Sequence, residues 1–281
     1  MIYTQQKELH LAIETLKNQG KTIGLVPTMG ALHKGHLSLI KKAIEENDTV
    51  VVSIFVNPTQ FNNPTDLQRY PRTLDADTAL IATVDKNVIV FAPEVTDIYG
   101  NDVAAQHFDF DNLDKVMEGA SRPGHFDGVG TIVKKLFEIV MPNRAYFGEK
   151  DYQQLLIIKK MVQQTGLPVT IVPCPIVRNA EGLALSSRNA LLSEAMRQRA
   201  TFIYQTLLQA KECFATHSPA EVTDWVTQVF ANEPDFELEY FTITDAHTLQ
   251  PITQKEADKD YRAFIVVHAE GVRLIDNISM N

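Results

Sequence analysis

The sequence predicts an α/β protein, in which a doubly wound parallel sheet is followed by a second, smaller α+β domain. Between residues 20 and 175, short β-branched runs alternate with segments of helical period, which is the pattern of βαβ units. The alternation ends at Pro173 and Pro175, because closely spaced prolines favour extended backbone and interrupt both helices and strand ladders. We therefore expect two domains, at residues 1–175 and 176–281.

Each expected element rests on its own apolar pattern. The strands of the first domain are short apolar runs at Thr22–Val26, Val50–Val56, Val88–Phe91, Ala145–Phe147 and Val169–Val172. Helices are expected where apolar residues recur at helical spacing, at Leu37, Ile40, Ala43 and Ile44 and again at Val129, Ile132, Val133, Leu136, Phe137 and Val140. The second domain is expected to contain a long helix from about Ser193, a helix from Pro219, and strands at Leu238–Thr244 and Arg262–His268.

Composition places the chain among ordinary globular proteins. It has 281 residues, of which 44% are hydrophobic and 22% charged, and a chain of this length can build a large core without disulfides or structural metals. The longest near-continuous apolar run, Val50–Val56, is far shorter than the roughly 18 residues of a membrane helix. The polar N-terminus lacks the order of a secretory signal, so we expect a cytoplasmic protein.

Cysteine and charge exclude further classes. Cys174 and Cys213 lie far apart without a C-x-x-C spacing, which argues against a disulfide framework or a zinc site. With 26 Lys and Arg against 35 Asp and Glu, the formal charge is −9, so broad attraction to nucleic acid is not expected. Any anionic ligand must be met by local groups.

A segment with two glycines and two histidines joins the first expected strand to the first expected helix. His33 and His36 bracket Gly35 at a helix N-terminus, where unpaired N–H groups and the helix dipole favour an anion. Gly30 and Gly35 let that anion approach the backbone closely. The segment is neither a Walker loop nor a G-x-G-x-x-G motif. We expect both imidazoles to donate to one phosphate; the alternative is two surface histidines at a helix start.

Positive and hydroxyl groups supply further anion contacts. After the Ala145–Phe147 strand, Lys150 provides a compact charge for phosphate oxygens, and Asp151 is placed to cap a helix. This segment should share a sheet edge with the histidines, since ligands of open α/β sheets gather beyond the carboxyl ends of strands. Beyond the domain boundary, Ser186–Arg188 can clamp a departing phosphate, whereas Ser193 is expected to cap the next helix.

Neutral amides mark a place for a polar substrate. Asn57 and Gln60 follow the second expected strand, where amides can hold a hydroxyl and a carboxylate without like-charge repulsion, although Asn57 alone would indicate only a turn. Residues 62–65 are expected to form a polar turn and a mobile flap. Of the pair Gln153 and Gln154, one is expected to point to solvent.

These segments closely resemble those of the pantoate–β-alanine ligase family, within the His-x-Gly-His nucleotidyltransferase superfamily. The match extends through Tyr70–Thr73, Ser121–Phe126 and Arg273–Asn277 and covers nearly the whole chain. The resemblance implies ATP-dependent condensation of (R)-pantoate with β-alanine to pantothenate, AMP and pyrophosphate through a pantoyl-adenylate. It also implies a Rossmann-like N-terminal domain that binds nucleotide and pantoate, a smaller C-terminal lid associated with the dimer, a homodimer, and a magnesium requirement.

The resemblance also implies residue roles. His36 stands at the position of a proton donor, and the other expected catalytic residues are His33, Lys150, Ser186, Ser187 and Arg188. The ATP site comprises Met29, Gly30, Ala31, Leu32, His33, Lys34, Gly35, His36, Gly148, Glu149, Lys150, Asp151, Val177, Leu185, Ser186, Ser187 and Arg188. Substrate contacts are expected from Gln60, Gln154 and Asn57, and Asp77 matches a magnesium position. On their own residues, Asp75 and Asp77 indicate only the start of a helix.

Three other functions fit part of the pattern. A nucleotidyltransferase of the same superfamily would join a nucleotide to a small phosphorylated alcohol without an amide step. A class I aminoacyl-tRNA synthetase shares His-x-Gly-His, but the acidic charge opposes tRNA binding. A non-catalytic nucleotide sensor would need the phosphate-facing groups but not the amides Gln60 and Gln154. The family also usually has Gly-Pro-Asn-Glu where this chain has residues 62–65, so flap mobility is expected to differ.

Overall fold

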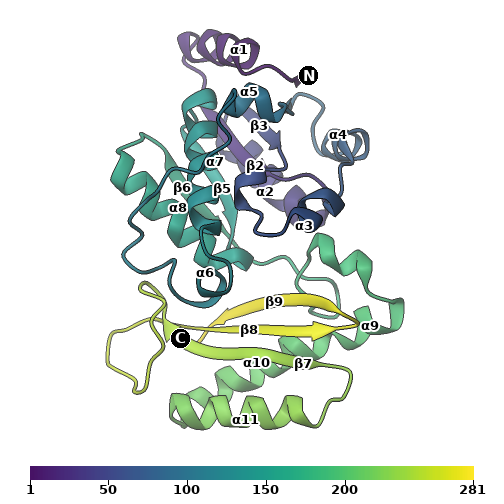
Figure 1. The fold of residues 1–281 in the computed structure, drawn as a ribbon, viewed down its shortest axis with the longest axis vertical. Coiled ribbons are helices and arrows are strands. Elements are labelled where there is room, and N and C mark those ends of the chain that lie inside the picture. The colour runs from purple at the N-terminus through teal and green to yellow at the C-terminus, as the bar shows by residue number, and fades with distance from the viewer. The chain divides into compact units, whose positions relative to one another are not determined.

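The chain forms two compact units, Met1–Pro175 (unit 1) and Ile176–Asn281 (unit 2), which Figure 1 colours from purple to teal and from green to yellow. The computed structural model describes residues 1–281 apart from the side chain of Asp66. The division falls at the end of the segment that contains Pro173 and Pro175.

Unit 1 is built on one six-stranded sheet in the order β1-β4-β3-β2-β5-β6, and every pair of neighbours is parallel. The strands are β1 Ile2–Tyr3, β2 Ile23–Thr28, β3 Thr49–Ile54, β4 Ile89–Phe91, β5 Arg144–Gly148 and β6 Thr170–Cys174. The predicted doubly wound parallel sheet is confirmed, and each of the five expected strands overlaps one that is present. Only the two-residue β1 had no sequence prediction.

Eight α-helices connect the described strands of unit 1. They are α1 Gln6–Asn18, α2 Lys34–Glu46, α3 Pro64–Arg69, α4 Leu74–Ala82, α5 Val95–Tyr99, α6 Met117–Ser121, α7 His125–Val140 and α8 Tyr152–Thr165. The expected apolar stripe on α7 is buried, with Val140 fully inaccessible and Phe137 2% exposed. On α2 the stripe is narrower, since Ile40 and Ala43 are buried and Leu37 is only half-buried. These faces cover the sheet and leave the strand ends for the connecting loops.

Unit 2 is an α+β fold with an antiparallel sheet in the order β7-β8-β9. Its elements are α9 Glu194–Arg199, α10 Thr201–Phe214, α11 Pro219–Ala231, β7 Glu237–Asp245, β8 Tyr261–Ala269 and β9 Val272–Ser279. The expected long helix from Ser193 is two helices, because the chain leaves the helix for one residue at Ala200. One buried apolar cluster joins α10 and α11 to the three strands, including Leu207, Val226 and Ile265.

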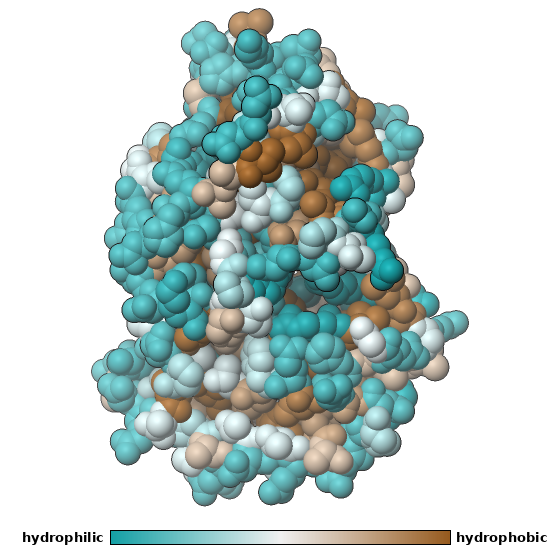
Figure 2. Space-filling view, viewed as in Figure 1, coloured by the Kyte–Doolittle hydropathy of each residue, from teal (hydrophilic) through white to brown (hydrophobic). Residues whose placement is uncertain are grey.

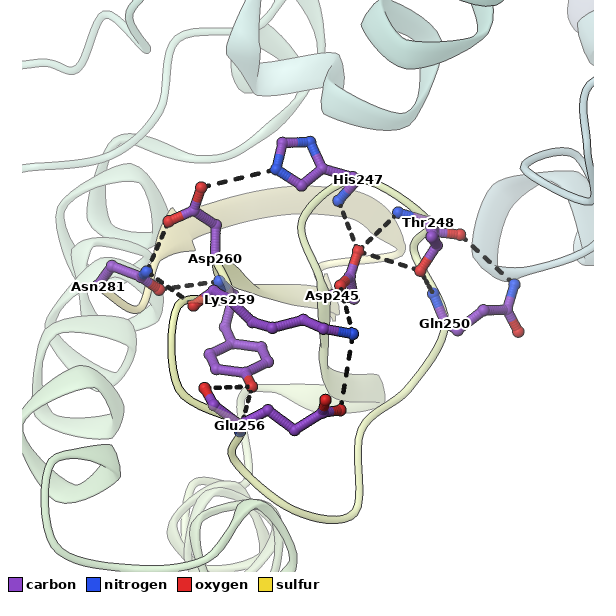
Figure 3. A network of polar contacts seen from close by, with 9 residues as sticks. Asp245, His247, Thr248, Gln250, Glu256, Lys259, Asp260 and Asn281 are labelled. Carbon is purple, nitrogen blue, oxygen red and sulfur yellow. Dashed lines mark hydrogen bonds and ion pairs between the residues drawn. The ribbon is translucent and has the colours of Figure 1, made fainter.

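The long connection between β7 and β8 is held by polar contacts around its base (Figure 3). The carboxylate of Asp245 accepts bonds from the Thr248 backbone N–H at 2.8 Å and from the Thr248 hydroxyl at 3.1 Å. At the other side, the Asn281 amide donates to the Lys259 carbonyl and to the Asp260 carboxylate. The last residue of the chain therefore ties down the end of this loop.

The face drawn in Figure 2 is mostly hydrophilic, with apolar patches between the polar residues. The large hydrophobic residues that are exposed include Met1, Ile2, Leu11, Val103, Leu191 and Leu208. Among the residues described, no helix has both the length and the apolar character needed to cross a membrane.

Candidate active site

The ligand segments predicted in unit 1 lie at the carboxyl ends of β2 and β5. These two strands are neighbours and pair in parallel, Gly24 opposite Arg144. From β2 the chain winds towards β3 and β4 on one side, whereas β5 leads to β6 on the other. The strand order thus reverses between β2 and β5, and such a switch point is where open α/β sheets bind ligands. The loop after Thr28 and the segment after Gly148 share this edge.

The side chains of His33 and His36 are bonded to the backbone at the start of α2. His33 is the N-cap residue, and its Nδ1 accepts from the Gly35 backbone N–H at 3.1 Å. His36 Nδ1 accepts from the backbone N–H of His33 at 3.3 Å, and the ring centroids are 4.1 Å apart. A ring nitrogen that accepts from an amide carries no proton, so each neutral ring carries its proton on Nε2. Both imidazoles therefore have Nε2–H as their remaining donor.

Burial favours the neutral form of both rings. Burial lowers the pKa of His33 and brings the pKa of His36 to about 3. Lys150 lowers both values further, and His33 adds to the effect on His36, whereas Asp151 opposes it. The sequence left the protonation of His36 open, and burial of the ring favours its neutral form by lowering its pKa. The same interactions place Lys150 and Asp151 within electrostatic range of both rings.

The backbone N–H groups ahead of α2 already have hydrogen-bond partners within the protein. The N–H groups of Ala31 and Leu32 donate to the carboxylate of Asp77 at 3.0 and 2.7 Å. The N–H of Gly30 lies 3.2 Å from the Thr28 hydroxyl oxygen. These three N–H groups lie ahead of the helix N-terminus, which begins at Lys34, so their bonds do not test the prediction that the helix N-terminus receives an anion.

Asn57 and Gln60 form a buried amide pair beside residues 29–36, which we call the histidine loop. Asn57 Nδ2 donates to Gln60 Oε1 and to the Gly128 carbonyl, both at 3.1 Å, and Asn57 Oδ1 accepts from the Tyr99 hydroxyl at 2.6 Å. Asn57 is only 1% exposed, so it orients Gln60 from inside the protein. Gln60 Nε2 lies 2.8 Å from the sulfur of Met29. Because a thioether is a weak acceptor, this N–H group remains suited to a stronger ligand acceptor.

Two residues without a role in the sequence prediction hold the backbone of Gln60. The Gln60 carbonyl accepts from His125 Nδ1 at 2.8 Å and from Arg122 Nη2 at 3.2 Å. Burial, followed by the positive charge of Arg122, lowers the pKa of His125 to about 4. Both residues lie in the Ser121–Phe126 match, and that match was the only signal that could have found them. Their contact with Gln60 spans more than 60 residues of sequence.

Gln153 and Gln154 have different environments. Gln153 is buried, donates to the carbonyls of Leu113 and Val116, and accepts from the Glu118 N–H. Gln154 is half-buried. Gln154 is thus the member of the pair that is partly exposed to solvent. Gln153 is a structural residue that holds the chain leading into α6, which leaves Gln154 as the candidate for a ligand.

The predicted flap begins as a capped helix. The Asn63 side chain accepts from the Thr65 N–H at 2.8 Å at the start of α3, and Asn62 donates to the Pro123 carbonyl at 2.7 Å. The polar turn at residues 62–65 is thus joined to the segment that supports Gln60. Its movement over the site stays a prediction.

In unit 2, the predicted phosphate clamp follows a small hairpin. Arg178 and Ala184 form an antiparallel bridge, and the Leu185 N–H donates to the Val177 carbonyl at 2.9 Å. Ser186 then caps the 3₁₀ helix η3 (Ser187–Leu191), accepting from the Arg188 N–H at 3.0 Å. The Arg188 side chain is exposed. The hairpin therefore sets the backbone from which the clamp residues project.

A buried ion pair fixes this hairpin to β9. The two guanidinium nitrogens Nη1 and Nη2 of Arg178 donate to the carboxylate of Asp276 at 2.5 and 2.9 Å. Arg178 also donates to the Gly182 carbonyl, and its guanidinium carbon lies 3.6 Å from the centre of the Tyr204 ring. Only 4% of the Asp276 side chain is exposed. The guanidinium of Arg178 is thus held in this pair.

The position that the family resemblance implies for magnesium, Asp77, is already hydrogen-bonded within the protein. Across the part of the chain that the structure describes, no three or more His, Cys, Asp or Glu side chains are arranged to hold a metal ion. Asp77 is 2% exposed and already accepts three hydrogen bonds, from Ala31, Leu32 and Thr73. Magnesium prefers an octahedral oxygen shell that retains water, which this buried carboxylate does not offer.

A parallel sheet with paired imidazoles and a lysine at its switch point defines an α/β protein of the His-x-Gly-His nucleotide-binding class. The family model described as pantoate-beta-alanine ligase matches residues 1–279. The chain belongs to the pantoate–β-alanine ligase family and is an enzyme of the ligase class.

Relatives and solved structures resemble this chain over almost its full length. The chain is 51% identical over 280 residues to the pantothenate synthetase of Christiangramia forsetii, covering 100% of this chain and 99% of the relative. It is 54% identical to that of Flavobacterium psychrophilum with the same coverage. The crystal structure of pantothenate synthetase from Thermus thermophilus shares 41% identity, with a TM-score of 0.89 and 99% coverage of both chains. That of pantoate-beta-alanine ligase from Francisella tularensis, complexed with beta-gamma ATP and beta-alanine, shares 40% identity and a TM-score of 0.81, covering 100% of this chain and 97% of the other.

Proposed function

We propose that this chain condenses pantoate with β-alanine at the expense of ATP, and that the histidine loop is the centre of its adenylation site. One observation carries the assignment to the loop: His33 and His36 both accept backbone N–H groups at Nδ1. Each neutral ring therefore carries its proton on Nε2, from which it can donate to a ligand. Lys150 adds a positive charge within range of the same rings. These are the groups that a triphosphate requires.

In the first half-reaction, a carboxylate oxygen of pantoate attacks the α-phosphorus of ATP. The bond between the α-phosphorus and the bridging oxygen breaks, and pyrophosphate leaves with the electron pair. No protein nucleophile is needed, so the protein aligns the reactants and stabilises the charge that develops. His36 donates a hydrogen bond from Nε2, with His33 and Lys150 beside it. Gln60 Nε2, held by Asn57, binds pantoate together with Gln154.

In the second half-reaction, the β-alanine amine attacks the acyl carbon of the adenylate. The bond from that carbon to the phosphate oxygen breaks, AMP leaves, and the amine gives up a proton to water. Gln60 holds the amine substrate after pyrophosphate has gone. We expect ordered addition, with ATP and pantoate first and β-alanine after pyrophosphate release. Initial-rate patterns that require all three substrates before pyrophosphate appears would contradict this order.

Unit 2 supplies the remaining groups in this proposal. Ser186, Ser187 and Arg188 bind the departing pyrophosphate, and Val177 and Leu185 complete the nucleotide site. Residues 1–175 act as the nucleotide- and pantoate-binding domain, and residues 176–281 act as a lid that excludes water from the adenylate.

The proposed enzyme uses magnesium, forms a homodimer and works in the cytoplasm. Magnesium would bind the phosphates of ATP, because phosphate oxygens with retained water suit this ion better than the protein groups present. A homodimer follows from the family resemblance. Cys174 and Cys213 are free thiols, which fits the reducing conditions of the cytoplasm.

The test is product formation from defined substrates. Mass spectrometry of a reaction with ATP, pantoate and β-alanine should detect pantothenate, AMP and pyrophosphate. Labelled pyrophosphate should exchange into ATP only when pantoate is present, which separates the adenylation from nucleotide transfer to a phosphorylated alcohol. ATP binding without turnover would identify a nucleotide sensor instead. In single-turnover assays, His36→Ala should lose adenylation while keeping its fold, and near-normal adenylation would contradict the role of His36.

A further inference from the structure

Asp77 lies outside the histidine loop in sequence but contacts it directly. On the premise that the chain carries out the proposed ligase reaction, we propose that Asp77 is a positioning residue that fixes the loop carrying His33 and His36, and that it does not hold magnesium. The proposal rests on the hydrogen bonds of its carboxylate, the backbone conformation of the loop, and the burial of the contact.

The carboxylate of Asp77 joins two segments 45 residues apart. Its Oδ1 accepts from the Leu32 N–H at 2.7 Å, and its Oδ2 accepts from the Ala31 N–H at 3.0 Å and from the Thr73 hydroxyl at 3.1 Å. Asp77 itself lies in the first turn of α4, where its own N–H donates to the Thr73 carbonyl. The acid is thus anchored in α4 and holds the loop from there.

The loop adopts a backbone conformation that needs such a partner. Gly30 has φ +85° and Ala31 has φ +51°, so a non-glycine residue occupies the left-handed region, where its Cβ is crowded. This conformation turns the successive N–H groups of Ala31 and Leu32 towards one point, a concavity that attracts an anion. Asp77 is that anion. A Cβ on Gly30 would lie only 3.1 Å from Asp77 Oδ2, so the glycine also permits the approach.

The contact determines where the imidazoles stand. Leu32, whose N–H is bound to Asp77, directly precedes the N-cap His33. The rings in turn are bonded to the backbone of this same helix start, through the Gly35 and His33 N–H groups. A shift of the loop therefore moves both Nε2–H donors together. A carboxylate has about four acceptor sites, and three of them are occupied here, in a residue that is 2% exposed.

The primary test compares Asp77→Asn with Asp75→Asn, which changes an exposed acid in the same helical turn. We expect Asp77→Asn to reduce the single-turnover rate of adenylation about 100-fold, the scale of a reacting group displaced by about 1 Å. The KM for pantoate and the magnesium concentration at half-maximal rate should stay unchanged, and Asp75→Asn should retain the wild-type rate. Restoration of the Asp77→Asn rate by excess magnesium would overturn the proposal.

A second measurement does not depend on turnover. In ligand-free protein, nitrogen NMR signals of the histidine rings report which ring nitrogen carries the proton and how it is bonded. Asp77→Asn should shift the Nδ1 signals of His33 and His36, and Asp75→Asn should leave them in place. Unchanged ring signals in Asp77→Asn would overturn the positioning role. Broadening of ring signals by Mn²⁺ alone, lost specifically in Asp77→Asn, would identify a metal site and overturn it as well.

A rescue experiment addresses the backbone directly. Ala31→Gly removes the crowding at positive φ, so adding it to Asp77→Asn should recover part of the lost rate, and no recovery would contradict the proposal. If Asp77→Asn does not fold, Thr73→Val removes one hydrogen bond to Asp77 and should reduce adenylation in the same way but less. Failure of the wild-type chain to form pantothenate would defeat the proposed function alone, since the NMR comparison still decides what Asp77 does.

Discussion

In unit 1 the carboxylate of Asp77 accepts bonds from two neutral backbone amides, whereas in unit 2 the carboxylate of Asp276 faces the guanidinium of Arg178. Both acids are buried, and both hold a segment predicted to bind ATP. The partners of Asp77 are neutral N–H groups of the loop backbone, whereas the partner of Asp276 is the charged side chain of Arg178 at the base of a hairpin. The two contacts therefore control different properties.

Backbone amides can bind Asp77 only if the loop bends, so this contact determines loop geometry. Ala31 adopts φ +51° in that bend. The pair in unit 2 places few demands on the backbone, because Arg178 bridges Ala184 as in an ordinary hairpin. It does bury two opposite charges, and each is costly without the other. We therefore expect Asp77 chiefly to set the position of the His33 and His36 side chains, and the Arg178–Asp276 pair chiefly to set the stability of unit 2.

The largest expected effect on stability comes from breaking that pair. Asp276→Ala leaves the guanidinium of Arg178 buried without its carboxylate, so the free energy of unfolding of unit 2 should fall by about 3–5 kcal/mol. Asp77→Asn weakens hydrogen bonds whose donors are all uncharged and leaves no buried charge without a partner, so its cost should be about 1–3 kcal/mol. Urea unfolding followed by far-UV circular dichroism measures both. An equal or larger loss in Asp77→Asn would reverse the comparison.

The control for Asp276→Ala is an ion pair on the same sheet that is more exposed. Glu239 pairs with Arg273 at 2.8 Å, with 31% and 28% of the two side chains exposed. Solvent screens such pairs, so Glu239→Ala should cost no more than about 1 kcal/mol. If both variants lose the same stability, burial of the Arg178–Asp276 pair is not the source of its effect.

The second prediction concerns pH and the histidine loop. The folded pKa of His36 is about 3, below the ordinary value of 6.5. As pH falls below 6.5, the unfolded chain gains a proton at this ring and the folded chain does not, so stability falls with pH towards 3. Between pH 7 and pH 5 the loss from His36 should be about 1–2 kcal/mol, since one pKa unit corresponds to about 1.4 kcal/mol.

His36→Asn isolates this contribution, because an amide does not titrate and the other ionisable groups are unchanged. Urea unfolding at pH 7, 6 and 5 should show a shallower loss of stability in the variant than in the wild type. Parallel curves for the two proteins would show that the His36 ring is not kept neutral by the fold. Asp276→Ala serves as a control from unit 2. It should lower the free energy of unfolding without changing the part of its pH dependence that comes from His36.

The third prediction tests the support of the buried amide pair. A Cβ added at Gly128 would lie 2.3 Å from the Thr59 carbonyl oxygen and 2.8 Å from the Gln60 nitrogen. Gly128→Ala should therefore cost about 1–3 kcal/mol of stability and displace Gln60, raising the KM for pantoate. A Cβ at Gly130, on the same helix, would lie 3.0 Å from the Phe108 ring and 3.3 Å from the Phe110 ring but near no backbone atom of Gln60, so Gly130→Ala should be milder. Equal effects on the KM would contradict a specific role for the Gly128 contact.

The alternation of strands and helices was predictable because each element of the parallel sheet carries its own apolar pattern. The two missed strands lack such a pattern. The strand β1 has two residues, and β9 places Asp276 and Asn277 at buried positions where an apolar pattern would be expected. Asp276 can be buried only because Arg178, 98 positions away, neutralises it. No local window of sequence contains that partner.

The candidate site also has parts that local sequence indicates and parts that it does not. The segments around His33, Lys150 and Ser186 follow strands or open helices, so local sequence indicated their place. Their supports are tertiary contacts: Asp77 reaches the loop across 45 residues and His125 reaches Gln60 across 65. The sequence shows the start of the helix that carries His36, but it does not show the acid that binds the loop ahead of that helix.

The smallest expected effect comes from a helix cap in unit 2, away from the Arg178–Asp276 pair. The hydroxyl of Ser193 accepts from the Met196 N–H at 3.1 Å at the start of α9, so Ser193→Ala should lower stability by about 1 kcal/mol. The KM for ATP should not change, because the cap does not hold the hairpin. Asp276→Asn, in contrast, weakens the contact that holds the hairpin and should raise that KM. If Ser193→Ala raises the KM for ATP as much as Asp276→Asn does, loss of stability in unit 2 alone accounts for the change, and the pair has no positioning role beyond it.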